Sequence, residues 1–344
     1  MPWAITKFSK GEIAKAGRTL TDRNASFGDR SHAMDVMSSW RAAQAYPMRA
    51  PLMMLRGKAA DVDPQAVVVQ RHKRAPSIIG KLHRFPKMEL SRMQDIGGCR
   101  AIVSTVEDVE KLNQHIQKSR TRNELHREYN YIASPKESGY RGVHLTFKYQ
   151  GEKAEYNGYF VELQLRSKIQ HAWSTTVEIV DTFTNQALKS SEGQSDWLRF
   201  FKMASAEFAR LEDRPIGEQF AGVDTHADLT RLAHQLSVVR RLNAFAVSAN
   251  HIIQKSDNKT DYFLLELTDE GSKVQITQYK MSEFERATAS YLQKEKLAKT
   301  DAATDVVLVA ASSMHALQNA YPNYFADSSE FVRLMERALA RGGV

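Results

Sequence analysis

The chain has 344 residues, of which 42% are hydrophobic and 26% are charged. These proportions are ordinary for a globular protein, and the length allows two or three domains. Its one cysteine, Cys99, excludes an internal disulfide framework and a cysteine-based zinc site. No apolar run is long enough to span a bilayer, and the first residues lack the apolar core of a signal peptide. We therefore expect a cytoplasmic protein with no membrane partner.

The net charge of +8 is unevenly distributed along the chain. Residues 56–92 contain nine lysines and arginines but only three acidic residues. Such a block favours polyanions, either the phosphates of a nucleotide or the backbone of a nucleic acid. A solvated basic face is the alternative, and the charge alone does not decide between them.

Apolar periodicity and chain breakers predict a mixture of helices and strands. Residues 10–60 are expected to be helical, with breakers at Pro47 and Pro51. Further helices are expected at 76–85, 105–119, 168–183, 194–215, 225–250, 282–298 and 328–341, and strands at 64–73, 99–104, 124–129, 142–149, 159–167, 261–268, 272–279 and 305–312. The sequence Asp-Glu-Gly at 269–271 predicts a hairpin between two of these strands. We expect a domain boundary near the polar stretch 213–224.

Four polar side chains in the basic block could converge on a triphosphate. Arg71 and Lys73 alternate on an expected strand, so they share one face. Ser77 and Lys81 are four residues apart on the following helix, so they also share a face. Ser77 lies near the helix N-terminus, where backbone amides favour anions. Basic strand–helix junctions are common, however, and this pattern is weak by itself.

Asp95 precedes Gly97, Gly98 and an expected strand. A carboxylate at such a strand edge, with little bulk around it, suits Mg²⁺, which is satisfied by one or two carboxylates together with substrate phosphates. The alternative is a helix C-terminus capped by Gly97, in which Asp95 has no chemical role.

The strand expected at 159–167 directs Glu162, Gln164 and Arg166 to one face. An acid, an amide and a cation in register suit the floor of a site. There Glu162 would meet a metal or accept a proton, and Arg166 would meet phosphate. A solvated outer sheet face is the alternative.

The stretch SPKESGYRGVHLTF, residues 134–147, places an aromatic residue between two glycines and next to cations. We expect Tyr140 to be exposed and to stack on a base, with Lys136 and Arg141 placed for phosphates. His144 begins a strand and either orients a phosphate or packs in the core. Together these groups predict a nucleotide ligand.

Taken in order, these motifs resemble the RelA/SpoT-type alarmone synthetase domain. The resemblance covers residues 65–182 and includes the stretches YIASPKESGYRGVH, VELQLR and HAWSTTVE. It implies that ATP is bound by Arg71, Lys73, Ser77, Lys81 and Arg100, that Mg²⁺ and catalysis depend on Asp95 and Glu162, and that the acceptor is bound by Lys136, Tyr140, Arg141, His144, Gln164 and Arg166.

The same resemblance implies a fold and a reaction. The implied fold class is α+β, with a nucleotidyltransferase-like mixed β-sheet flanked by helices and a small C-terminal α+β domain. The expected domains are an N-terminal helical region (1–60), the synthetase domain (61–215) and a C-terminal regulatory domain with a helical linker (216–344). The implied reaction transfers the ATP β,γ-pyrophosphate to a ribose 3′-hydroxyl, with Glu162 activating the hydroxyl and Asp95 anchoring Mg²⁺.

The C-terminal part resembles that of CapRel, the fused toxin–antitoxin subgroup of toxic small alarmone synthetases. Tyr321 and Tyr324 match by spacing the YxxY motif that a pseudo-zinc-finger domain of this subgroup offers to the ATP site, which implies inhibition in cis. The resemblance also implies that the acceptor is the adenosine of the tRNA 3′ CCA end and that a phage structural protein activates the enzyme in antiviral defence. A loop buried against its own last helix is the alternative for the two tyrosines.

Two other hypotheses stay open. One is a small alarmone synthetase that makes (p)ppGpp or (p)ppApp from free nucleotides. The other is a non-catalytic regulator that binds nucleotides or RNA, which is disfavoured because both carboxylates and the phosphate-facing groups are present. The sequence leaves the oligomeric state open, and a monomer is compatible with it.

Overall fold

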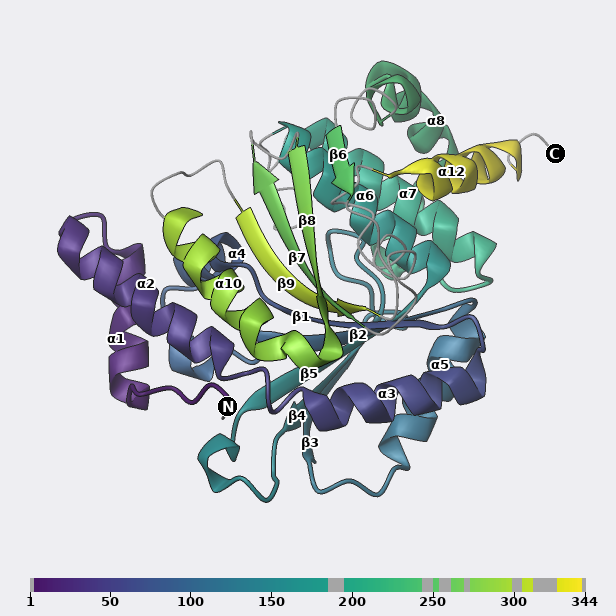
Figure 1. The fold of residues 1–344 in the computed structure, drawn as a ribbon. Helices are drawn as coiled ribbons and strands as arrows, with labels where there is room; N and C mark the ends of the chain where they lie inside the picture. Colours follow the sequence, from purple (N-terminus) through teal and green to yellow (C-terminus); the bar gives the residue numbers. More distant parts are fainter. Residues whose placement is uncertain are drawn as a thin grey trace.

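The computed structural model describes residues 3–184, 195–242, 250–253, 261–268, 273–298, 305–311 and 327–341. Within these ranges the chain forms a nine-stranded mixed sheet with helices around it, as Figure 1 shows. The strands are β1 (Val67–His72), β2 (Gly97–Val103), β3 (Glu124–Asn130), β4 (Val143–Lys148), β5 (Phe160–Ser167), β6 (Asn250–Ile253), β7 (Asp261–Thr268), β8 (Lys273–Lys280) and β9 (Asp305–Ala311). Their order across the sheet is β3-β4-β5-β2-β1-β9-β7-β8-β6. The predicted α+β class is confirmed.

The α-helices cover both faces of this sheet. They are α1 (Lys10–Thr21), α2 (Phe27–Ala42), α3 (Arg49–Val62), α4 (Ala75–Arg84), α5 (Val106–Gln117), α6 (Lys168–Thr184), α7 (Ser195–Leu211), α8 (Thr225–Gln235), α10 (Phe284–Ala298) and α12 (Ser329–Arg341). None of the helices in the described ranges is long and apolar enough to cross a lipid bilayer.

The first five strands form the part of the sheet that carries the polar motifs. β2 and β5 run parallel, whereas the β1–β2, β4–β5 and β3–β4 pairs are antiparallel. Helices α3 and α5 pack on one face, where Leu163 and Leu165 of β5 are fully buried in the same core as Leu55 and Leu112. Because strand side chains alternate, the polar residues of β5 point to the opposite face. The alternation predicted for this strand is confirmed.

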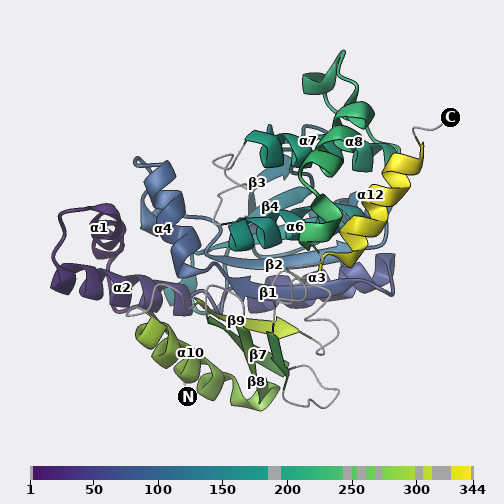
Figure 2. The same cartoon turned by 90° about the horizontal axis from the view of Figure 1, so that it is seen from above.

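Two further cores hold the helices in place. One contains α1, α2 and α4, with Trp40 and Ile78 among its buried residues. The other contains α6, α7, α8 and α12, with Trp197 and Phe331 at its centre. Figure 2 shows α12 lying beside α6, α7 and α8, so the last described helix belongs to the same packed layer as helices more than a hundred residues earlier in the chain.

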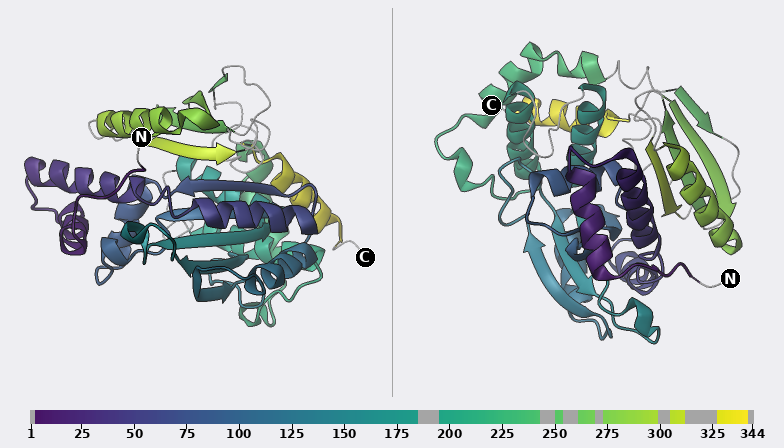
Figure 3. Two further views of the ribbon diagram at one scale, coloured as in Figure 1. Left: turned by 60° about the horizontal axis from the view of Figure 1, so that its bottom comes forward. Right: turned by 90° about the vertical axis from the view of Figure 1, so that its left-hand side faces the viewer.

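The C-terminal strands continue the same sheet. β9 pairs antiparallel with β1, where Gln70 faces Ala310 and Arg71 faces Val309. β7 pairs with β9 and β8, and the predicted antiparallel hairpin of β7 and β8 is confirmed. Figure 3 shows α10 packed along these strands. The sheet of the polar motifs and the C-terminal strands are therefore joined edge to edge.

One predicted helix is interrupted. Within the described part of the helix predicted at 225–250, α8 ends at Gln235, the backbone at Ser237 adopts a positive φ of 49°, and helical structure resumes at residues 238–242. That left-handed conformation interrupts helical hydrogen bonding.

Candidate active site

Paired residues from five strands form a polar floor on the sheet face opposite α3 and α5. Two rows of Cα partners cross the strands β1, β2, β5, β4 and β3: Arg71–Gly98–Glu162–Thr146–Arg127 and Val69–Arg100–Gln164–His144–Tyr129. Partners in a ladder direct their side chains to the same face. Residues far apart in sequence therefore meet on one surface.

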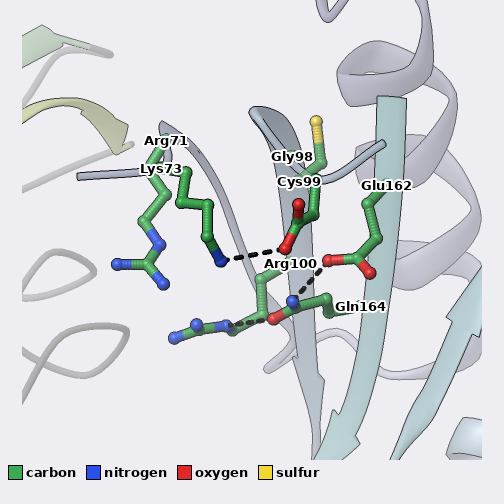
Figure 4. Close-up of a pocket in the computed structure, with 8 residues that line it drawn as sticks. Arg71, Lys73, Gly98, Cys99, Arg100, Glu162 and Gln164 are labelled. Carbon is green, nitrogen blue, oxygen red and sulfur yellow. Dashed lines mark hydrogen bonds and ion pairs between the residues drawn. The ribbon is translucent and has the colours of Figure 1, made fainter. Parts of the chain in front are cut away.

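A pocket in this floor brings the two predicted carboxylates together. Asp95 and Glu162 both line it, and Arg71, Lys73 and Arg100 supply its positive charge (Figure 4). It opens into a cleft of about 630 Å³ that extends from Lys81 to Tyr129 across the sheet. The predicted arrangement of two acids beside a cationic cradle is present in the structure.

Asp95 is held by two lysines. The Nζ atoms of Lys73 and Lys81 each lie 2.9 Å from its Oδ2 atom. Burial alone would raise the pKa of this carboxyl, but the two ammonium groups outweigh burial and hold the pKa far below its usual value. The alternative role of Gly97 as a helix cap is excluded, because Gly97 begins β2 and packs closely against Gln44 and Met48.

The second oxygen of Asp95 has the properties of a metal ligand. Its Oδ1 atom is buried and accepts no hydrogen bond from the part of the chain that the structure describes. A buried carboxylate oxygen without a donor is costly unless a ligand satisfies it. In the described ranges no cluster of three or more histidine, cysteine or acidic residues could enclose a metal. The donor set fits Mg²⁺, which takes one or two carboxylates and completes its shell with phosphates and water.

Glu162 lies in a hydrogen-bonded row with its neighbours. Nδ1 of His144 lies 2.9 Å from its Oε1 atom, and Gln164 Nε2 donates to Oε2 at 2.6 Å. Burial acts to raise the pKa of Glu162, but His144 outweighs it and lowers the pKa to about 2. For His144, burial acts to lower the pKa, and Tyr140 and Glu162 together raise it above its usual value. Both shifts favour the charged forms of the two side chains.

Tyr140 differs from its prediction. Its side chain is 9% exposed, so the expectation that it is open to solvent is wrong, whereas its stacking on the acceptor base stays a prediction. Its hydroxyl lies 2.5 Å from His144 Nε2 and accepts a hydrogen bond from Nε of Arg166 at 3.2 Å. Burial acts to raise the pKa of Tyr140, but Arg166 and His144 lower it to about 8. Tyr140 thus extends the polar row behind Glu162 while still lining the cleft.

Arg141 also departs from its predicted role. It is 5% exposed and donates hydrogen bonds to the carbonyl oxygens of Ile132 and Ile216 and to Ser205 Oγ. The preceding Gly139 has a φ of +90° and lies against Ser205, where a Cβ would clash. This turn directs Arg141 into the protein, so the structure assigns it to packing rather than to acceptor phosphates.

The remaining predicted residues have different surroundings. Arg100 is 7% exposed, and its Nε donates to Gln164 Oε1 at 3.4 Å. Lys136 places its ammonium over the rings of Tyr131 and Tyr140. Ser77 lies in the first turn of α4, and its predicted contact with ATP stays a prediction. The predicted inhibitory Tyr321 and Tyr324 lie outside the described residues.

Of the cleft residues that the sequence analysis did not select, three lie together. Arg127, Tyr129 and Tyr131 line the cleft at its β3 side. They occur at alternate positions in REYNY, so they lie on one face of an extended segment. This alternation is the signal in the sequence that could have predicted them.

Comparisons with known proteins agree with this geometry. Residues 70–180 match the family described as "Region found in RelA / SpoT proteins". Residues 70–180 thus carry a RelA/SpoT region. This region contains both carboxylates and the cationic residues of the pocket.

Relatives of known name share this RelA/SpoT region. The GTP pyrophosphokinase YjbM of Bacillus subtilis (strain 168) is 34% identical over 122 residues, which are 33% of this chain and 56% of YjbM. The chain therefore spans little more than half the length of that relative. The crystal structure of the small alarmone synthetase 1 from Bacillus subtilis is 24% identical, with a TM-score of 0.42, covering 54% of this chain and 93% of that chain. The structure of a GTP pyrophosphokinase family protein from Streptococcus pneumoniae is 20% identical, with a TM-score of 0.41, covering 53% of this chain and 90% of that chain.

Proposed function

We propose that the protein is an Mg²⁺-dependent pyrophosphokinase that transfers the ATP β,γ-pyrophosphate to the 3′-hydroxyl of the adenosine at the tRNA 3′ CCA end. The observation that carries the catalytic part is the shared pocket of Asp95 and Glu162, opposite Arg71 and Lys73 and inside the RelA/SpoT region. Phosphoryl transfer needs charge neutralisation and alignment more than covalent chemistry. The pocket has groups suited to both.

In the proposed transfer step, the residues of the polar floor hold the reacting groups. The acceptor 3′-oxygen attacks the β-phosphorus of ATP and forms a new O–P bond. The bond from the β-phosphorus to the oxygen that bridges the α-phosphate breaks, and AMP leaves. Each lysine ammonium has three donors. Lys73 and Lys81 can therefore keep Asp95 and still bind phosphate oxygens.

Glu162 acts on the acceptor hydroxyl. A carboxylate whose pKa is about 2 is fully ionised at neutral pH but is a weak base. It therefore aligns the hydroxyl by accepting its hydrogen bond and takes the proton only as the O–P bond forms. His144 holds the carboxylate in this orientation.

Asp95, with Glu162 as a second carboxylate, would hold the Mg²⁺ ion. The orphaned Oδ1 atom of Asp95 supports this assignment. A magnesium ion there would neutralise phosphate charge on the bound triphosphate.

The acceptor is proposed from the basic character of the chain and the CapRel resemblance of its C-terminal part. The alternative is a small alarmone synthetase that makes (p)ppGpp or (p)ppApp from free nucleotides. A specific observation favours this alternative, because the 34% identical relative is named as a GTP pyrophosphokinase.

Regulation is proposed to come from the C-terminal residues 216–344, a pseudo-zinc-finger-like unit that restrains the enzyme in cis through Tyr321 and Tyr324. A phage structural protein would release this restraint and start antiviral defence in the cytoplasm. Strand β9 of this unit pairs with β1 of the proposed synthetase domain. Because such tethering raises the effective concentration of a weak contact, this pairing supports intramolecular control.

Labelled substrate tests the acceptor. The purified chain carrying Tyr324→Ala is incubated with γ-labelled ATP, Mg²⁺ and either tRNA, periodate-oxidised tRNA, GDP or AMP. We expect label in intact tRNA but not in oxidised tRNA, which lacks the 3′-hydroxyl, and no transfer by Glu162→Gln. Label in free nucleotide alone would establish the alternative function.

Expression tests the restraint. We expect Tyr324→Ala to stop growth, whereas Tyr324→Phe, which keeps the ring, stays tolerated. A point variant is a sharper test than deleting residues 225–344, because that deletion also removes α8 and α12 from a core of the synthetase. Harmless expression of Tyr324→Ala would contradict autoinhibition.

A further inference from the structure

We propose that an aromatic stack, formed by the end of β3 and the turn that follows it, binds the unpaired nucleotides that precede the acceptor nucleotide at a single-stranded RNA 3′ end. The stack consists of Arg127, Tyr129, Tyr131 and Lys136 and is called the β3 platform below. The inference deepens the proposed function, since it takes the acceptor ribose to lie at Glu162. It adds a subsite that would distinguish a polynucleotide acceptor from a free nucleotide.

The β3 platform is a continuous column of flat and charged groups. The rings of Tyr129 and Tyr131 are stacked, with centroids 5.4 Å apart and planes 10° from parallel. The guanidinium carbon of Arg127 lies 5.6 Å from the Tyr129 centroid, and Lys136 Nζ lies 4.4 Å from that of Tyr131. Tyrosine rings and arginine planes are the surfaces on which unpaired bases stack.

Packing does not account for the outer end of this column. Every residue of β3 is exposed, and Tyr129 is 41% exposed. β3 is the last strand on its side of the described sheet. Exposed aromatic residues on an edge strand favour association with other molecules. A cationic aromatic column beside a phosphate-binding pocket favours a nucleic acid as that molecule.

The column leads to the reacting groups. Tyr129 pairs with His144 on β4, and the Tyr131 ring meets the His144 ring edge to face at 5.3 Å. His144 contacts Glu162. The platform is two strand spacings from Glu162, roughly 10 Å. A nucleotide adjacent to the acceptor would therefore reach the platform, whereas the acceptor ribose itself would stay at Glu162.

The charge around the platform also suits a nucleic acid strand. Arg127 and Lys136 sit at its two ends, whereas the neighbouring acids have other partners. Glu137 is paired with Lys202 at 3.2 Å, and Glu128 accepts a hydrogen bond from Asn113 of α5 at 2.9 Å. The cleft side of the platform therefore presents positive charge to a backbone phosphate.

Binding without ATP tests the platform independently of transfer. The affinities of the trinucleotide CCA, labelled with a fluorophore at its 5′ end, and of AMP are measured on the full chain and its variants. Stacking on one base contributes about 1–3 kcal/mol. We therefore expect Tyr129→Ala to raise the Kd of CCA by about five- to a hundred-fold and to raise that of AMP much less. Tyr129→Phe and Tyr129→Trp, which keep a ring, should bind CCA within about twofold of the wild type.

A matched control is available on the same strand. Leu125 is 39% exposed and is not among the residues that line the cleft, so Leu125→Ala should leave both affinities unchanged. Equal weakening of CCA and AMP by Tyr129→Ala, or no effect on CCA, would overturn the platform. Loss of CCA binding in Tyr129→Phe would overturn stacking. Tyr129-dependent CCA binding together with no labelled tRNA would instead refute the proposed transferase and leave this subsite intact.

Discussion

Nδ1 of His144 lies 2.9 Å from Oε1 of Glu162, and both side chains are mostly shielded from solvent. This contact joins the Glu162 carboxylate to a buried row that continues through the Tyr140 hydroxyl to Arg166. In this row the pKa of His144 is raised and that of Glu162 is lowered, so the contact favours the ionised form of Glu162. A side chain that the sequence left ambiguous between phosphate binding and packing is thus placed as a positioning residue for Glu162.

The His144–Glu162 pair predicts a pH-dependent stability. Replacing His144 with Gln should lower the free energy of unfolding by about 1–3 kcal/mol near pH 6, because a hydrogen bond to a charged group is lost. The raised pKa of His144 means that its contribution is complete below 6.5 and is lost as the pH rises through the folded-state value. The lowered pKa of Glu162 means that its contribution is present above 4.5 and is lost as the pH falls toward 2.

Urea unfolding of wild type and His144→Gln at pH 3, 5.5 and 9 checks this prediction. The stability difference should be greatest at pH 5.5 and smaller at both extremes. His115→Gln removes an exposed histidine of α5 and serves as the control. A difference independent of pH would mean that the two groups do not form an ion pair.

Removing the charge of Asp95 is predicted to reduce both metal binding and activity. Asp95→Asn leaves Lys73 and Lys81 without their carboxylate and weakens the oxygen donor proposed for Mg²⁺. We expect transfer to fall by roughly a hundred- to a thousand-fold. Calorimetric titration of Mg²⁺ in the presence of a non-hydrolysable ATP analogue should show the matching loss of affinity. Asp61→Asn, at an exposed acid of α3, should bind Mg²⁺ normally. Unchanged Mg²⁺ affinity in Asp95→Asn would show that Asp95 is not a ligand.

Local patterns were sufficient to predict much of this site. Alternation in β5 correctly placed Glu162 and Gln164 on one face, because strand geometry fixes which side chains share a surface. Spacing could not predict that Lys73 and Lys81 both reach Asp95, since that contact depends on how α4 and the turn before β2 are packed. The burial of Tyr140 was missed for the same reason: it rests on Trp173 and the α6–α7 core, which lie far along the chain.

The pairing of strands that are distant in the sequence could not be predicted either. The strand at 305–311 was predicted, but its partner was not. Gln70 and Ala310 face each other across β1 and β9 although the residues between them include most of the chain. An apolar strand carries no local information about which edge it joins. The sequence therefore predicted a separate C-terminal unit and could not predict that its strands continue the sheet of β1 to β5.

The packing of Phe331 allows a prediction of how strongly α12 stabilises the protein. Its side chain is fully buried, and its ring lies 5.2 Å from Phe208 and 5.8 Å from Phe201. Phe331→Ala should lower the free energy of unfolding by about 3–5 kcal/mol, because it leaves a cavity in this core. Urea unfolding measures the change, with Phe27→Ala, at a ring that is 85% exposed, as the control. A loss below about 1 kcal/mol would mean that α12 is only loosely docked.

Arg41 connects the C-terminal unit to Lys73, the residue that follows β1. The guanidinium is fully buried, and its Nε donates to the backbone carbonyl of Lys73 at 2.9 Å. Its central carbon lies 5.5 Å from the ring centroid of Tyr291 on α10. Burial, followed by the charge of Arg41, lowers the pKa of the adjacent His72 to about 3, so that imidazole stays neutral beside the cation. The Arg41 guanidinium therefore contacts both Lys73, which is paired with Asp95, and Tyr291 of α10.

The Arg41–Tyr291 contact predicts energetic coupling between the two parts of the chain. In a double-mutant cycle of Arg41→Met and Tyr291→Leu, followed by urea unfolding, we expect a coupling of about 1–2 kcal/mol, since a desolvated cation over an aromatic ring is strongly attracted to it. Arg41→Met combined with Phe331→Ala should be additive, because the core cluster that contains Phe331 includes neither Arg41 nor Tyr291. If the first cycle is also additive, α10 does not contribute to holding Arg41, and the C-terminal unit has no direct energetic link to Lys73 through this residue.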